Sequence, residues 1–174
     1  MILAAASSLT PPTPHIDWAA LAPIVALLGG AVVALLVGLF RGRAARQVAV
    51  PLLSIAAFGA AAGLSIWQWG TDHDIIDGAL RADHLAMAMN LIFCAAGAVT
   101  VLLSWRSVAP REAAHGEYHA LVLTAAAGMA VLVGAQSLVT VFLGYELLSI
   151  PLYVLCATEM RRAGSLESGL KYLI

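Results

Sequence analysis

The sequence predicts an all-α integral membrane protein, a polytopic bundle of transmembrane helices, and three observations support this. Apolar residues make up 61% of the 174 positions, charged residues only 11%, and the mean hydropathy is +0.92. Soluble domains are about half apolar and a quarter charged, so this chain needs a bilayer as its solvent. Five apolar runs are also long enough to cross a membrane, and basic residues gather in alternate connectors.

The five predicted spans cover residues 19–40, 48–69, 85–105, 118–135 and 137–158. Each is close to the ~20 residues that a helix needs to cross a hydrocarbon core of ~30 Å. We predict helices because a lipid-exposed backbone must satisfy its own hydrogen bonds, and the alternation typical of a barrel strand is absent. Trp18, Trp67, Trp69 and Trp105 lie at span ends, where amphipathic rings favour the membrane interface.

The connectors predict the orientation. The connectors after the first, third and fifth spans contain Arg41, Arg43, Arg46, Arg106, Arg111, Arg161 and Arg162. The connector 70–84 has four aspartates and Arg81 as its one basic residue, and the tail 1–17 has no Lys or Arg. By the positive-inside rule, the arginine-bearing connectors lie in the cytoplasm and the N-terminal tail 1–17 lies outside, in the periplasm.

The last residues predict the start of a sixth span. Gly164, Ser165 and Glu167 resemble a helix start, with a small residue, a capping hydroxyl and an acid in the first turn. The apolar run 170–174 then continues for only about two turns. A helix cannot end at that depth with unpaired carbonyls, so we expect a longer protein or a partner segment to complete the span.

Sorting the ionisable residues by depth leaves two candidates for chemistry. Glu146 lies near the middle of the fifth span, and Lys171 lies about two turns into the sixth. A charge at mid-bilayer costs about 2.5–3.5 kcal/mol on insertion scales, and such residues usually mark ion or proton paths. The alternative is that Glu146 is held by one interhelical partner and serves only to keep the bundle together.

Helical periodicity predicts a polar stripe that includes Glu146. Ser149, Tyr153 and Cys156 fall on the same face of the helix, running toward the cytoplasm. Pro151 removes the hydrogen bond to the carbonyl of Leu147, which then needs water or a side chain as its partner. We therefore expect this stripe to be partly hydrated, which would let the carboxylate exchange protons.

Lys171 has a local explanation as well as a functional one. Glu167 lies four residues earlier, in the favourable order for a helical ion pair, and a lysine can also extend toward the interface. Counting from the cytoplasmic ends, the Cα atoms of Glu146 and Lys171 differ in depth by roughly 8 Å. Water-bridged or long-range coupling is therefore expected rather than direct contact.

Other polar and small residues in the spans predict packing rather than chemistry. Asn90 is predicted to form an interhelical hydrogen bond, and Gly59 and Gly63 form a GxxxG that we expect to serve intrachain packing. Cys94 and Cys156 are predicted to be small buried residues. His115 and His119 have i, i+4 spacing without an evident third metal ligand, and no motif for a redox cofactor is present.

The stretch 117–174 resembles a known family. Its EY-ALVL opening, its GYELLSIPLYVL core and its SLESGLKY restart are similar to the N subunit of proton-pumping NADH–quinone oxidoreductase, respiratory complex I. This is one of the antiporter-like subunits of the membrane arm. The stretch 82–93, ADHLAMAMNLIF, resembles the start of the family's third helix more loosely, and the first two spans match in position and orientation only.

The resemblance implies a fourteen-helix antiporter-like fold with two inverted five-helix repeats. Residues 18–116 would form the first three helices, and 117–174 the start of the first repeat, with helices four, five and part of six. The family's helix-five glutamate falls on Glu146 and its helix-six lysine on Lys171. The glutamate pairs with a lysine of helix seven, and protons pass to lysines of helices eight and twelve. Those helices follow Ile174, so this stretch alone is not expected to pump.

The resemblance also implies a function, partners and a location. The function would be proton translocation by a subunit of an NADH:quinone oxidoreductase in the bacterial inner membrane. NADH, FMN, iron–sulfur clusters and quinone would bind to other subunits, and neither a cofactor nor a metal to this chain. The M-type antiporter-like subunit and the small K-, J- and A-type subunits would be its neighbours. The alternatives are a subunit of a multi-subunit sodium/proton antiporter or membrane-bound hydrogenase, and a truncated scaffold that transports nothing.

Overall fold

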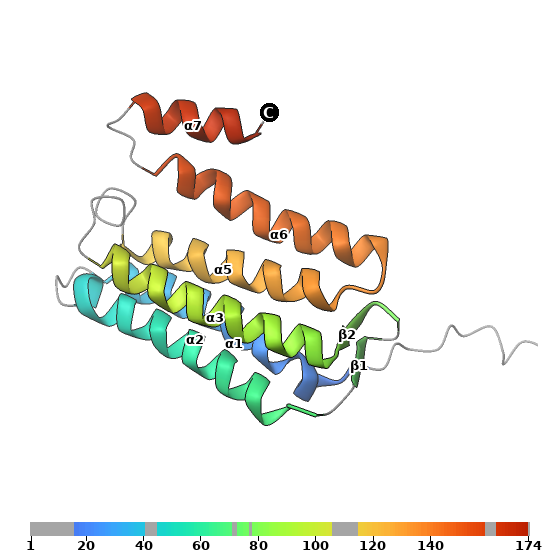
Figure 1. Ribbon diagram of the computed structural model, residues 1–174. Coiled ribbons are helices and arrows are strands. Elements are labelled where there is room, and N and C mark those ends of the chain that lie inside the picture. The colour runs from blue at the N-terminus through green and yellow to red at the C-terminus, as the bar shows by residue number, and fades with distance from the viewer. Residues whose placement is uncertain are drawn as a thin grey trace, which may run out of the picture.

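A computed structural model describes residues 16–40, 45–70, 73–76, 78–105, 115–158 and 163–173. Within them, five long helices lie side by side and a shorter helix packs beyond the last of them (Figure 1). The elements in chain order are α1 (Trp18–Gly38), a π-helical turn η2 (Ala45–Ala49), α2 (Val50–Trp67), β1 (His73–Ile76), β2 (Leu80–Ala82), α3 (His84–Ser104), α5 (His115–Gly134), α6 (Leu138–Cys156) and α7 (Ala163–Leu173).

The five predicted spans are confirmed as helices long and apolar enough to cross a membrane. They cover Trp18–Gly38, Gln47–Trp67, His84–Ser104, Gly116–Gly134 and Leu138–Cys156, each boundary within two residues of the prediction. The chain is therefore an all-α polytopic membrane protein, apart from one short hairpin. Trp18, Trp67 and Trp69 are 70%, 76% and 50% exposed at helix ends, as expected for interfacial rings.

Three of the helices begin at capping side chains that the sequence supplies. Asp17 accepts hydrogen bonds from the backbone N–H groups of Ala19 and Ala20 at the start of α1, at 3.0 and 3.2 Å. Asp83 does the same for Ala86 at 2.7 Å, and the Ser137 hydroxyl accepts from Thr140 at 3.1 Å. These oxygens satisfy N–H groups that have no intrahelical partner, which fixes where α1, α3 and α6 begin.

The connector after α2 contains a β-hairpin that the hydropathy pattern did not predict. Strands β1 and β2 pair antiparallel, and Gly78 in the turn has a φ of 64°, which glycine adopts without strain. Backbone hydrogen bonds join the hairpin to two segments that are distant in sequence. Asp17 N–H, just before α1, donates to Ile75 C=O, and Gln136 N–H, between α5 and α6, donates to Ala79 C=O, each at 3.0 Å. It therefore covers one end of the bundle (Figure 1).

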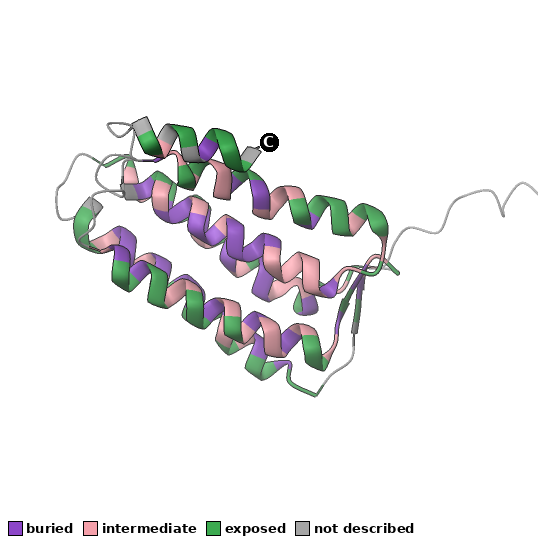
Figure 2. Ribbon diagram, turned by 45° about the horizontal axis from the view of Figure 1, so that its top comes forward, coloured by how far each residue is buried: buried purple, intermediate pink, exposed green. Residues whose placement is uncertain are grey.

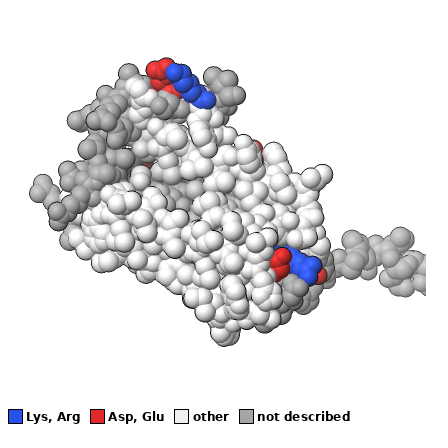
Figure 3. Space-filling view, in the orientation of Figure 1, with Lys and Arg blue, Asp and Glu red and all other residues white. Residues whose placement is uncertain are grey.

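The core lies between α1, α2, α3 and α5, and Figure 2 shows the buried residues concentrated there. Phe58 of α2 is 1% exposed and packs against Gly97 of α3, where a Cβ atom would lie 2.4 Å from the ring. Outward faces are apolar too. On the face shown in Figure 3, most of the surface between the two ends is uncharged, and charged atoms gather mainly on α7 and near the hairpin.

Three predictions, two on packing and one on helix capping, need correction. Gly59 and Gly63 are exposed, and a Cβ atom on either would meet nothing within 4 Å, so this GxxxG does not serve packing among the described residues. Cys94 is buried as predicted, but Cys156 is exposed. The Ser165 hydroxyl does not cap α7: it donates to the Cys156 carbonyl at 2.8 Å and so ties α7 to the end of α6.

Candidate functional site

Glu146 lies at the middle of α6, as the sequence predicted, and it lines a groove between α5 and α6. The groove has a volume of about 430 Å³. Its described lining residues are Leu121 and Thr124 from α5, and Leu143, Glu146, Leu147, Ile150 and Pro151 from α6. Glu146 is half-buried and is the one carboxylate among them, so a single ionisable group faces an otherwise nearly apolar space.

Pro151 places a second polar group beside Glu146. It has no N–H, so the carbonyl of Leu147 lacks its usual donor four residues later. Leu147 and Pro151 both line the groove with Glu146. The Thr124 hydroxyl, on the opposite wall, donates to its own helix at the Ala120 carbonyl, at 2.8 Å, and keeps acceptor capacity. The lining of the groove is nevertheless almost wholly apolar, so Glu146 is its main polar group.

Two glycines hold α6 against α5 on either side of Glu146. A Cβ atom on Gly128 of α5 would lie 2.5 Å from the backbone nitrogen of Leu148, so the two backbones touch there. On α6, a Cβ atom on Gly144 would lie 3.0 Å from the side chain and 3.1 Å from the backbone nitrogen of Leu132. Close approach at small residues is the usual way that membrane helices pack tightly, and here it fixes the position of Glu146.

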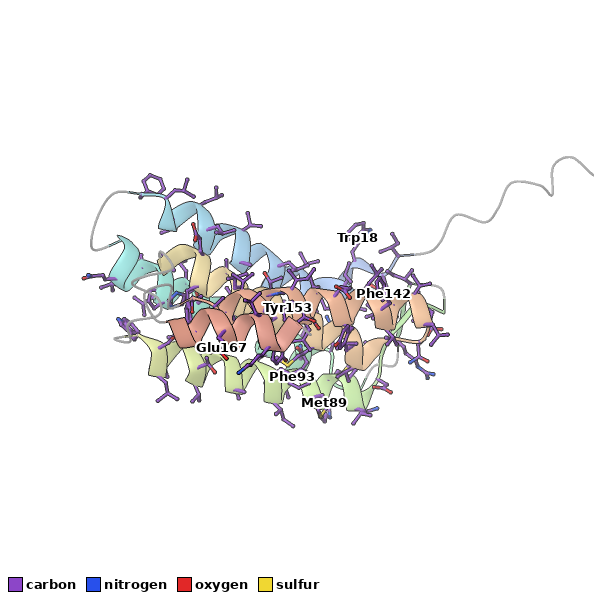
Figure 4. All side chains as sticks on the ribbon, turned by 90° about the horizontal axis from the view of Figure 1, so that it is seen from above. Trp18, Met89, Phe93, Phe142, Tyr153 and Glu167 are labelled. Carbon is purple, nitrogen blue, oxygen red and sulfur yellow. The ribbon has the colours of Figure 1, made fainter. Side chains whose placement is uncertain are left out.

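The predicted polar stripe does not form one hydrated path with Glu146. Ser149 and Tyr153 are absent from the described lining of the groove, and Ser149 is only 5% exposed. Tyr153 contacts α7 instead: the rings of Tyr153 and Tyr172 pack edge to face with centroids 5.3 Å apart, and Tyr153 lies beside α7 in Figure 4. Glu146 therefore lies on the boundary between the groove and this helix contact.

The structure gives Lys171 its local partner. The Nζ atom lies 2.6 Å from Oε1 of Glu167, one turn earlier on α7, and the two side chains are 74% and 64% exposed. Lys171 is not among the described residues that line the groove of Glu146. The structure therefore does not bring the two predicted site residues together in this groove.

Asn90 and His119 are buried polar side chains in the tightly packed half of the bundle. The predicted interhelical bond of Asn90 is present: its amide donates to the Ser65 hydroxyl on α2 at 2.6 Å. His119 of α5 is fully buried and packs edge-on against the Tyr118 ring, with centroids 5.4 Å apart. Among the described residues there is no group of three or more His, Cys, Asp or Glu that would hold a metal ion.

Comparison with known proteins shows which proteins this chain is similar to in sequence. It is 37% identical to NADH-quinone oxidoreductase subunit N 2 of Roseiflexus castenholzii. The 161 aligned residues cover 92% of this chain and 32% of that protein. It is 33% identical to NAD(P)H-quinone oxidoreductase subunit 2 of a Prochlorococcus marinus strain. That alignment, over 178 residues, covers 100% of this chain and 34% of that protein. This chain is a homologue of NADH-quinone oxidoreductase subunit N.

Further relatives agree with that relationship. Subunit N of Ruthia magnifica is 34% identical over 90% of this chain. No protein-family model matches the chain. The chain spans about a third of the length of the subunit N proteins that it matches.

Sequence reasoning missed three residues that shape the site. Thr124 lines the groove, and Gly128 and Gly144 set the contact between α5 and α6. The signal was present, because Thr124 and Gly128 are four residues apart and so lie on one face of a helix. In a mostly apolar helix, however, nothing in the sequence alone shows which face meets the neighbour.

Proposed function

We propose that this chain belongs to a proton-translocating membrane-arm subunit of an NADH–quinone oxidoreductase. The observation that carries the proposal is the position of Glu146, a half-buried carboxylate at mid-helix in a groove of about 430 Å³. A carboxylate held at that depth is costly, and such residues usually serve ion or proton movement. The homology to subunit N supports assigning that movement to protons driven by quinone reduction elsewhere in the complex.

In this proposal, Glu146 is the group whose charge responds to its surroundings. Water in the groove would exchange protons with it, assisted by the Leu147 carbonyl that Pro151 leaves without its helical donor. Lys171 would act at a distance, through its charge, because its head group pairs with Glu167. The resemblance to the family supplies the later lysines that would receive the proton.

The proposal extends to the surroundings of the chain. NADH, FMN, the iron–sulfur clusters and quinone would be bound by other subunits. The neighbours would be the M-type antiporter-like subunit and the small K-, J- and A-type subunits. The arginine-bearing connectors support a bacterial inner-membrane orientation with the N-terminus in the periplasm. Residues 18–116 would form the first three helices and 117–174 the start of the first antiporter-like repeat.

The test is Glu146→Gln in the full-length subunit, within the assembled complex in membrane vesicles. We expect proton uptake driven by NADH to fall several-fold, while the abundance of the complex changes little, since the amide keeps the shape and removes the charge. Glu117→Gln is the control, because Glu117 is an exposed acid at the start of the neighbouring helix α5. Equal losses of assembly and proton uptake would mean that Glu146 only holds the bundle together.

The same preparation separates the alternatives. Proton uptake that requires sodium would favour a sodium/proton antiporter subunit. Uptake that is unchanged in Glu146→Gln, with normal assembly, would favour a scaffold that transports nothing.

A further inference from the structure

A small cavity lies beneath the hairpin, in the half of the bundle away from Glu146. It has a volume of about 40 Å³ and lies between α1, α2, α3, α5 and the hairpin. The residues that line it include Ile24, Ser65, Gln68, Met87 and Asn90. The three neutral polar residues are well buried: Ser65, Gln68 and Asn90 are 1%, 8% and 6% exposed.

The hydrogen bonds that line this cavity are incomplete at Asn90. The Ser65 hydroxyl donates to the Ala61 carbonyl at 2.9 Å and accepts from the Asn90 amide at 2.6 Å. A carboxamide has two N–H donors and an oxygen with two lone pairs. Among the described residues, the remaining contact of Asn90 is the Cys94 thiol, a weak donor, at 4.0 Å from its oxygen. One N–H and most of the acceptor capacity of Asn90 are left over.

The size and lining of the cavity select the ligand. A water molecule needs roughly 10–15 Å³ of such volume and two to four polar partners, and both conditions are met here. A purely apolar cavity of this kind would stay dry. A cation is disfavoured, because a buried charge needs an opposite charge as its partner and the described lining contains no carboxylate.

We propose that this cavity is a water-binding site, in which one or two ordered water molecules complete the hydrogen bonds of Asn90 and link α2 and α3 to the cover formed by the hairpin. The water would accept from the free N–H of Asn90 and donate to its oxygen. It would also lie within the space shared with Ser65 and Gln68. A buried polar group in a membrane protein is thereby satisfied without a further side chain.

Radiolytic hydroxyl-radical labelling of the assembled complex in ¹⁸O-water tests this site, because bound water is the local source of the radicals. Met87 lines the cavity and is 4% exposed, so without bound water it should be almost inert. Met89 and Met129 are internal controls, since both are more exposed than Met87 and neither lines the cavity; Met89 points outward from α3 in Figure 4. We expect Met87 to gain ¹⁸O several-fold faster than either control.

Two variants sharpen the result. Asn90→Leu keeps the approximate volume and removes the amide, and it should lower the labelling of Met87 to the level of Met129. Ala130→Leu fills the cavity from α5 and leaves Asn90 in place, and it should have the same effect even if Asn90→Leu fails to assemble. If Met87 in the unaltered complex is labelled no faster than Met129, the cavity is dry and the proposal is wrong.

Discussion

The two sides of this bundle handle polar groups in opposite ways. In the most apolar stretch of α5, half of the residues are buried, whereas in the equivalent stretch of α6 only 17% are. In the tightly packed half, the polar side chains between α2 and α3 are neutral and bonded to each other, as Ser65 and Asn90 are. The carboxylate at mid-helix, Glu146, lies on the thinly covered helix and faces a groove.

The difference follows from the energetics of burial. A neutral amide or hydroxyl is stable in a dry interior once it has a partner, but a charge there costs several kcal/mol unless it is paired or hydrated. Close packing therefore suits the neutral pair of Ser65 and Asn90, whereas the carboxylate of Glu146 lines a groove among the described residues. Where α6 does touch α5 closely, it does so at glycines that flank Glu146 and leave the groove between them.

The largest expected effect comes from closing that contact. Gly128→Val would place a branched side chain where even a Cβ atom lies 2.5 Å from the backbone of Leu148. A backbone contact cannot relax as a side-chain contact can, so we expect a loss of about 3 kcal/mol or more. The amount of assembled complex in the membrane measures it, and most of the complex should be lost.

The matched control is Gly63→Val on the apolar helix α2. A Cβ atom there meets nothing within 4 Å, so assembly should stay near normal. If both valines are tolerated equally, α5 and α6 are not held together at Gly128. The contact that is argued to fix the position of Glu146 would then be absent.

The sequence was sufficient for the helices and for the mid-helix position of Glu146, because both depend on hydropathy along the chain. The hairpin depends on main-chain pairing in a polar connector, which hydropathy does not report. A signal was nevertheless present in the dipeptide Asp77–Gly78, which is typical of tight hairpin turns. The interhelical bond of Asn90 was also predictable, because a buried amide in an apolar helix requires a partner.

The rotation of α6 was not predictable to the same degree. Its residues are apolar nearly all round, so the sequence does not state which face meets α5 and which meets α7. Periodicity predicted Ser149 and Tyr153 on the face of Glu146, but neither lines the groove, and the Tyr153 ring packs against Tyr172 of α7. Contacts between neighbours, which a single sequence does not contain, make that choice.

A smaller effect is expected from the neutral polar pair in the packed half. Ser65→Ala removes the hydroxyl that accepts from Asn90, and Ser54→Ala is the matched control on the same helix. Both serines are buried and both donate to a carbonyl one turn earlier, at 2.9 Å, but only Ser65 is known to bond a second helix. We expect Ser65→Ala to lower stability by about 0.5–1.5 kcal/mol more than Ser54→Ala, read as thermal dissociation of the complex. Equal losses would show that the link between α2 and α3 contributes nothing.

The smallest expected effect is at Lys171. Its head group pairs with Glu167 one turn earlier on the same helix, and such pairs contribute little to stability, so Lys171→Ala should leave assembly unchanged. Proton uptake should fall less than in Glu146→Gln, because the lysine acts on the groove only through its charge at a distance. Glu167→Gln breaks the same ion pair and keeps the lysine, so it separates the local role from the long-range one. If Lys171→Ala abolished proton uptake while Glu167→Gln had no effect, the lysine itself would carry the proton. The functional contrast between the two halves would then lie on α7 and not on α6.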